Sequence, residues 1–244
     1  TRSYSVTGVQ ACALPISRRV AEQDLAKAAA DRRERAARSA ALAEQARAAN
    51  RLEEAVRHAQ AHCELDPESA AAWHRLGALR AAVGDHAGAG EALEQALRRE
   101  PDSAEVLLLL GVTHLQSGTP RHAAAALLRG TLAAPDSADQ HHFLGLAAVS
   151  LGWLRAAEAE LSTALRLDPQ RPATAYSLAA LLAALGPARQ AEAKDWYARA
   201  LRLGAEPDPG LDRILLPTAT AGQPGAAGPP GGHPTEARQG IDKP

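Results

Sequence analysis

The sequence contains little of what usually fills a protein core. It has no methionine, and aromatic residues make up only 3% of its 244 residues. Alanine and leucine are left to build the core, and small residues let helices approach closely but bury little area each. Stability in such a chain has to come from many similar units that stack on one another. The length by itself allows either a compact domain or a short solenoid.

Further absences narrow the functional classes. Cys12 and Cys63 are the only cysteines, too few for a disulfide framework. No stretch approaches the roughly 18 consecutive apolar residues that a membrane-spanning helix needs. The formal net charge of -1 lacks the basic excess that nucleic-acid binders normally carry. We therefore expect no membrane span in this chain and no nucleic-acid partner.

What the sequence does have is a period of 34 residues. Proline recurs at this spacing, and glycine, alanine and leucine keep step with it. The prolines are Pro67, Pro101, Pro135 and Pro169, and the glycines are Gly84, Gly118, Gly152 and Gly186. A 34-residue period is typical of stacked helix–turn–helix units. It predicts five repeats, at residues 36–69, 70–103, 104–137, 138–171 and 172–205.

Each repeat carries the local signals of two helices. The first helix contains a Leu-Gly pair, as at Leu76 and Gly77, although glycine inside a helix costs about 1 kcal/mol against alanine. The recurrence of this glycine suggests that the facing helix comes too close for a side chain. The next glycine, such as Gly84, suits a left-handed helix end. The second helix stops at the residue before proline, which is forced out of the helical conformation.

This pattern resembles the tetratricopeptide-repeat family, whose fingerprint is Trp-x-x-Leu-Gly followed by a packing alanine and a proline. Residues 36–205 carry the resemblance, most completely at Trp73 to Gly77, Ala89 and Pro101. It implies an all-α fold, a right-handed α-solenoid of about five helix–turn–helix repeats. The residues it implies for repeat packing are Trp73, Leu76, Gly77, Ala89, Leu110, Gly111, Ala123, Leu144, Gly145, Ala157 and Leu178.

The segments around the repeats are expected to differ from them. Residues 18–35 extend the first helix. The fifth repeat holds two extra residues, which moves its packing positions to Ala193, Tyr197 and Ala200. Residues 206–216 form a C-terminal capping helix with an apolar face of Leu211, Ile214 and Leu215. Residues 217–244 are rich in glycine and proline, and their composition predicts disorder.

Residues 1–17 are not expected to belong to the fold. Residues 6–16 resemble the translation of a common sequencing adapter. A signal peptide is the alternative, but its apolar stretch would be too short and is broken by Gln10 and Pro15. On the adapter interpretation, residues 1–17 are a disordered artefact and the natural N-terminus is missing. The compartment, cytoplasmic or periplasmic, is left open.

Candidate sites for chemistry are few. His58 and His62 are four residues apart, a spacing that can hold a metal on one helix face, and Cys63 follows them. Adjacent helical side chains do not face each other. Cys63 therefore neither completes this site nor pairs with His62 as a nucleophile. We predict no catalytic residue, no cofactor and no metal site.

The resemblance places ligand binding in a concave groove along the first helices of the repeats. The residues it implies for this groove are His74, Ala78, Leu108, Val112, Leu115, His142, Leu146, Val149 and Tyr176. The Lys, Arg and Asn residues with which the family clamps a peptide carboxylate are absent, and Glu105 and Asp139 lie at the edge. We expect an apolar or weakly basic peptide or helix as the ligand. The alternative is that these residues only pack against neighbouring repeats.

The histidines of this stripe add a pH dependence. An unperturbed imidazole gains its charge near pH 6.5. If His74 and His142 are unperturbed, basic ligands should bind more weakly below that pH.

The function predicted from the sequence is a non-catalytic protein–protein interaction scaffold. One alternative is an accessory repeat region of a larger enzyme or envelope-anchored protein that lacks its N-terminus here. Another is a helical-repeat RNA binder, which would need a basic groove. The Ala, Leu and Val residues of the predicted groove argue against that class.

Overall fold

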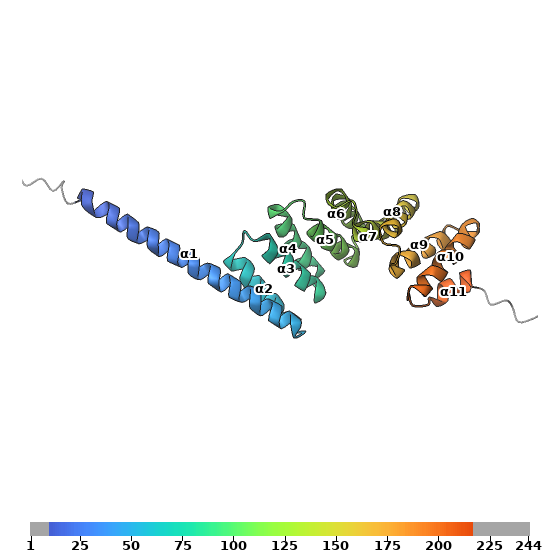
Figure 1. Cartoon of the computed structure of the whole chain (residues 1–244), viewed down its shortest axis with the longest axis horizontal. Helices are drawn as coiled ribbons and strands as arrows, with labels where there is room; N and C mark the ends of the chain where they lie inside the picture. The colour runs from blue at the N-terminus through green and yellow to red at the C-terminus, as the bar shows by residue number, and fades with distance from the viewer. Residues whose placement is uncertain (1–9, 217–244) are drawn as a thin grey trace, which may run out of the picture.

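The computed structural model describes residues 10–216, and within them the chain is helical without strands. The helices of the repeats are α1 (Gln10–Ala48), α2 (Leu52–Leu65), α3 (Ala70–Ala82), α4 (His86–Arg99), α5 (Ala104–Gln116), α6 (Pro120–Ala133), α7 (Ala138–Ser150), α8 (Leu154–Leu167), α9 (Pro172–Ala184) and α10 (Gln190–Arg202). A short 3-10 helix, η2 (Pro187–Arg189), precedes α10, and α11 (Pro209–Leu215) follows it. The helix pairs succeed one another along the length of the molecule (Figure 1). This confirms the predicted all-α solenoid.

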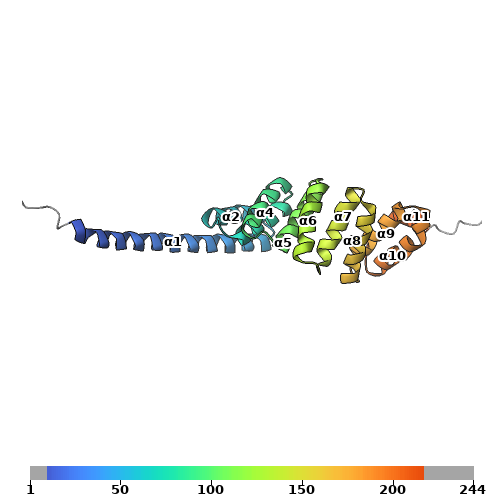
Figure 2. The same ribbon diagram turned by 90° about the horizontal axis from the view of Figure 1, so that it is seen from above.

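The helices form two layers. The odd-numbered helices α3, α5, α7 and α9 each contact the next odd-numbered helix, whereas α2, α4, α6 and α8 contact only the helices before and after them in the chain. We call the odd-numbered helices α1 to α9 the inner helices and the even-numbered helices α2 to α10 the outer helices. Figure 2 shows the successive pairs from above.

Close approach within each pair explains the recurring Leu-Gly. A Cβ atom added to Gly77 would lie 2.6 Å from Cγ of Leu93 on the facing outer helix. The same atom on Gly111 would lie 2.4 Å from Cγ of Leu127. These distances are well inside van der Waals contact, so a side chain at either position would push the two helices apart. The glycine is therefore needed for packing, despite its cost in helix propensity.

The turns follow from local chemistry. Ser69 begins α3 by accepting a hydrogen bond from the backbone N–H of Ala72, at 3.2 Å. Gly84 ends the same helix with φ at +84°, in the region that only glycine enters freely. In the fifth repeat, η2 takes up the two extra residues that the sequence indicated. Ala193, Tyr197 and Ala200 are consequently fully buried in α10.

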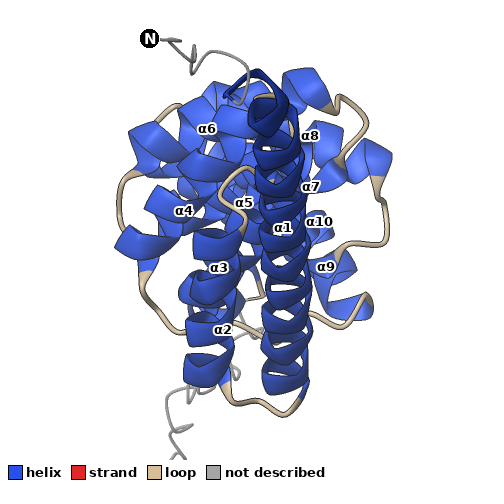
Figure 3. Cartoon of the chain, turned by 90° about the vertical axis from the view of Figure 1, so that its left-hand side faces the viewer, coloured by secondary structure: helices blue, strands red, loops and turns tan. Residues whose placement is uncertain are grey.

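The N-terminal helix is longer than expected. α1 begins at Gln10, within the stretch that resembles an adapter, so the structure differs from the predicted disorder of residues 1–17 where it describes them. Residues 18–48 contain no Gly or Pro, and a helix that is already formed extends at little cost. Residues 20–35 are exposed, and Ala36 is the first buried residue that the structure describes. Figure 1 shows α1 projecting past the repeats, and Figure 3 shows it in front of the other helices when the molecule is seen from its N-terminal end.

The C-terminal helix packs on the last repeat. Asp208 begins α11 by accepting hydrogen bonds from the backbone N–H groups of Gly210 and Leu211. Leu211 and Leu215 are buried, but Ile214 is 48% exposed. Two residues of the predicted apolar face thus pack against the protein and the third, Ile214, is largely open to solvent. The predicted disorder of residues 217–244 lies outside the described residues.

Candidate functional site: the inner face of the repeats

Each inner helix has one side packed against its partner helix and one side turned away from it. In α5, Leu110 is 6% exposed and Gly111 is buried against α6. Leu108, Val112 and Leu115 lie on the other side and are half-buried. Aliphatic residues of one helix thus lie in two environments, buried against the partner helix or partly exposed on the other side. The helical period determines on which side each residue lies. We use the term inner face for the partly exposed side of the inner helices.

The inner face is most aliphatic in repeats three and four. The aliphatic positions are Leu108, Val112 and Leu115 in α5 and Leu146 and Val149 in α7. Val149 is 38% exposed and the other four are half-buried. No charged side chain lies among these five residues. We call them the central stripe. The corresponding positions in α3 and α9 hold Ala78, Ala81, Ala180 and Ala183.

His142 belongs to the interior and not to the exposed inner face. Its side chain is 4% exposed, and its Nδ1 lies 3.0 Å from the hydroxyl oxygen of Thr174 on α9. Its ring packs edge-on against Phe143, with 5.0 Å between the ring centroids. Burial lowers the pKa of His142 to about 4. The expectation that His142 charges near pH 6.5 is therefore wrong, because the imidazole stays neutral well below that pH.

Tyr176 is partly covered by the protein itself. Its hydroxyl donates a hydrogen bond to the carboxylate of Asp208, the residue that begins α11. This bond is the main reason why the pKa of Tyr176 rises to about 12. Residues 205–209 and Pro172, Ala173 and Tyr176 together line a surface pocket of about 610 Å³. The inner face therefore ends, at repeat five, against the segment that leads into the capping helix.

A second pocket lies at the N-terminal end of the inner face. It has a volume of about 660 Å³, and His74 and Ala78 line it together with Glu44 and Arg75. The Glu44 carboxylate accepts hydrogen bonds from Nε of Arg47 at 2.8 Å and Nε of Arg75 at 2.9 Å. Sequence reasoning missed this ion-paired cluster. Its signal was available, because Glu44 stands one 34-residue period before Ala78.

The edge of the inner face carries less unpaired negative charge than its sequence suggests. The Asp139 carboxylate pairs with the guanidinium of Arg171, the residue immediately before α9. Glu105 is exposed and takes part in no ion pair among the described residues. One of the two edge carboxylates is thus already neutralised by the chain.

The residues implied for repeat packing lie between the helices. Leu76, Leu110, Leu144 and Leu178 are at most 8% exposed, and Ala89, Ala123 and Ala157 are fully buried. Gly145 is buried in the same way, and its added Cβ would lie 2.8 Å from Cγ of Leu161. Trp73 is only half-buried: its indole N–H donates to the carbonyl of Pro67 at 2.8 Å, and the Arg99 guanidinium lies over its ring.

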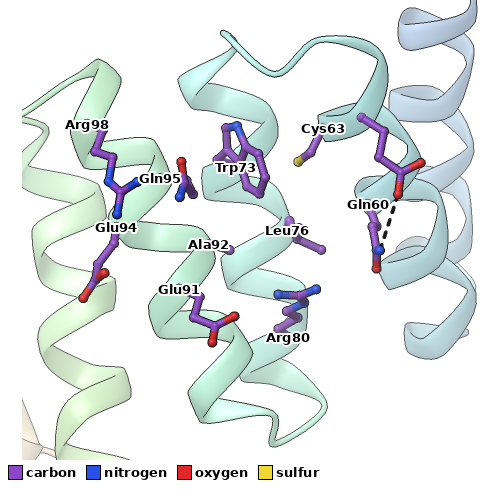
Figure 4. A pocket seen from close by; sticks show the side chains of 11 residues that line it. Gln60, Cys63, Trp73, Leu76, Arg80, Glu91, Ala92, Glu94, Gln95 and Arg98 are labelled. Carbon is purple, nitrogen blue, oxygen red and sulfur yellow. Dashed lines mark hydrogen bonds between the residues drawn. The ribbon is translucent and has the colours of Figure 1, made fainter.

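The outer side of repeats one and two holds a further pocket of about 440 Å³, lined by residues of α2, α3 and α4. Figure 4 shows Cys63 beside Trp73, with Arg80 and Glu91 further along the opening. Burial raises the pKa of the Cys63 thiol to about 11, so this cysteine is not a thiolate at neutral pH. In the described part of the chain, no group of three His, Cys, Asp or Glu side chains is placed to hold a metal ion.

Comparison with known proteins identifies the repeats. Two tetratricopeptide-repeat family profiles match, at residues 80–147 and 141–171. Residues 80–171 of this chain thus carry tetratricopeptide repeats. Proteins built from tetratricopeptide repeats bind other proteins or peptides and are generally non-catalytic. No curated protein is similar to the chain in sequence.

Solved structures share the tetratricopeptide-repeat fold. MamA from Desulfovibrio magneticus RS-1 matches with a TM-score of 0.65 at 19% identity, over 69% of this chain and 94% of that one. PilF from Pseudomonas aeruginosa matches with a TM-score of 0.63 at 22% identity, over 72% and 80%. YrrB, described as having an unusual peptide-binding site, matches with a TM-score of 0.61 at 21% identity, over 76% and 94%. At these identities the similarity concerns the fold.

Within residues 10–216, no helix combines the length and the apolar character that a membrane-spanning helix needs.

Proposed function

We propose that this chain is a non-catalytic scaffold that binds a peptide or helix of another protein along its inner face, centred on α5 and α7. The observation that carries the proposal is the central stripe, in which five partly exposed aliphatic side chains lie on the exposed side of the contacting helices α5 and α7. Exposed aliphatic side chains scattered singly need no explanation, whereas a contiguous stripe is typical of an interaction site.

The energetics favour a modest affinity. Fully burying one aliphatic side chain contributes about 1.5–3 kcal/mol, and these five are already partly buried, so each adds about 1 kcal/mol. The sum falls short of the roughly 8 kcal/mol that a micromolar complex requires. The ligand must therefore gain further contacts, and the pockets around His74 and Tyr176, at the two ends of the inner face, offer them.

The charges around the stripe give the ligand a weak preference. Glu105 is the free acidic group at the edge, because Asp139 is paired with Arg171. An exposed charge of this kind contributes to the encounter more than to affinity. The ligand that fits best is apolar with one or two basic residues.

A selection of peptides tests the proposal. A phage-display library of random peptides is panned on the immobilised chain. The affinity of the most enriched peptide is then measured by fluorescence anisotropy. The double variant Leu108→Asp/Leu146→Asp should keep its helical circular dichroism and lose at least about tenfold in affinity. The matched control is Leu154→Asp, which changes an exposed leucine of α8. Unchanged affinity in a folded double variant would remove the inner face as the binding site.

A further inference from the structure

The outer helix α6 exposes leucines where the other outer helices carry polar residues. Leu128 is 55% exposed and Leu132 is 78% exposed. One 34-residue period away on either side, the position of Leu128 is occupied by Glu94 and Ser162. The position of Leu132 is occupied by Arg98 and Arg166. The repeat architecture therefore does not require leucine at these positions, and among α4, α6 and α8 only α6 has leucine at both.

The two leucines belong to a straight seam on α6. Arg121, Ala125, Leu128 and Leu132 are separated by four, three and four residues, and all four are exposed. Positions with this spacing lie above one another on one side of a helix, as in the contact line of a coiled coil. The helix has no acidic residue. Asp136 follows the helix in the loop before α7 and is also exposed.

We propose that this seam is the contact surface of a homodimer, in which α6 packs antiparallel against α6 of a second copy. A two-fold axis beside Leu128 brings the two copies of Leu128 together and places Ala125 of each copy opposite Leu132 of the other. A small residue then faces a large one. The same pairing places Arg121 opposite Asp136, and neither residue forms an ion pair within the described chain. The seam is thus complementary to itself, as a two-fold interface requires.

The neighbouring outer helix α4 carries charges that fit this pairing. In the antiparallel dimer the two-fold axis runs across the outer helices, so α4 of one copy lies on the side of α4 of the other. α4 exposes Glu91 and Arg98. The register that pairs Arg121 with Asp136 also places Glu91 of one copy opposite Arg98 of the other. The formal net charge of -1 adds no long-range repulsion between the copies.

This surface is separate from the proposed peptide site. The seam lies on an outer helix, whereas the central stripe lies on the inner helices α5 and α7. A dimer formed through α6 would leave both inner faces free and present two peptide sites in one particle. Two linked sites raise the effective affinity for a partner that carries two copies of the peptide.

Sedimentation velocity of the full chain over a concentration series tests the dimer. The sedimenting mass should rise from 25.4 kDa towards twice that value with increasing concentration. Leu128→Glu/Leu132→Glu should weaken dimerisation by about 100-fold or more, because it buries four carboxylates in the contact. Ile214→Glu changes an equally exposed apolar residue on α11 and should leave the dimer intact. A chain that stays monomeric throughout, or a dimer that survives the double leucine change, would overturn the proposal.

A charge exchange tests the antiparallel arrangement. Arg121→Asp places two acidic groups together at each end of the seam and should weaken the dimer by about fivefold, as exposed pairs contribute little each. Adding Asp136→Arg to the same chain restores opposite charges and should recover the original affinity. Circular dichroism confirms that each variant is folded. A double variant as weak as the single one would rule out the proposed pairing.

Discussion

Repeats three and four differ from repeats two and five on the inner face, although all four share the same packing. At corresponding positions the central repeats hold Val112, Leu115, Leu146 and Val149, and the flanking repeats hold Ala78, Ala81, Ala180 and Ala183. The buried leucine and the close-packed alanine are the same in each. The packing that all four repeats share therefore does not require aliphatic side chains at the centre, although Leu108 and Leu115 also pack against the buried cluster around Leu127 and Leu144.

The two ends of the inner face are instead tied to the chain itself. In repeat two, Arg75 binds Glu44 of the preceding repeat at 2.9 Å. In repeat five, the hydroxyl of Tyr176 binds Asp208 of the capping segment.

Repeat four also forms such bonds, between Asp139 and Arg171 and between His142 and Thr174, but the five aliphatic side chains of the central stripe carry no polar atoms. The comparison teaches that the repeats share one scaffold, whereas the inner face has an aliphatic middle and two ends that carry polar and charged bonds.

The largest expected effect is a difference in unfolding free energy between a core leucine and an inner-face leucine of repeat three. Leu110→Ala should lower the free energy of unfolding by about 2–5 kcal/mol, because it opens a cavity between packed helices. Leu108→Ala, two residues away on the partly exposed side, should cost only about 1 kcal/mol. Urea denaturation followed by circular dichroism measures both. Equal losses would show that Leu108 is a core residue, and the division of the inner face would then fail.

The next largest effect is a pH dependence of stability that arises from His142, the buried histidine of α7. The folded pKa of His142 is about 4, below the ordinary value of about 6.5 in the unfolded chain. Between these values the unfolded state takes up a proton that the folded state does not. Stability present above pH 6.5 should therefore be lost as the pH falls towards 4, by about 3 kcal/mol at most.

His142→Leu isolates this effect from other titrating groups. The variant should be less stable at neutral pH, since Thr174 loses its partner, but its stability should depend less on pH between 6.5 and 4. Urea titrations of both chains at several pH values give the comparison. If both chains lose the same stability on acidification, His142 is accessible to protons and its place in the interior is wrong.

The smallest effect concerns the C-terminal end. Tyr176→Phe removes only the hydroxyl that binds Asp208 and should lower the free energy of unfolding by about 1 kcal/mol. The loss should be accompanied by faster hydrogen exchange in α11, because the bond joins the capping segment to repeat five. Exchange that is unchanged in α11 would mean that this end of the inner face is not held by the capping segment.

Much of the fold could be predicted from the sequence, because the period of 34 residues repeats the same local signals. Proline, the glycine at the helix end and the Leu-Gly pair each act within a few residues. The two extra residues of repeat five were visible in the same way, through the shift to Ala193 and Tyr197. The start of α1 was not, because Pro15 indicates a helix boundary, yet the helix begins at Gln10 and runs through it.

The candidate site was less predictable, because it depends on contacts between repeats. His142 and Leu108 share one position in the repeat, yet Thr174 from the following helix encloses the histidine. The pairing of Asp139 with Arg171 likewise joins α7 to the start of α9. Periodicity aligns such residues but says nothing about their partners. A three-dimensional arrangement was needed to tell the exposed stripe from the enclosed positions.

Methyl-resolved NMR of the folded chain, titrated with a peptide selected by panning, tests the central claim most directly. The account predicts that the largest shifts fall on the methyl groups of Leu108, Val112, Leu115, Leu146 and Val149. The methyl groups of Ala78 and Ala180 should shift less, since they lie towards the ends of the inner face. Shifts confined to the outer leucines Leu128 and Leu132, or to the ends alone, would contradict it.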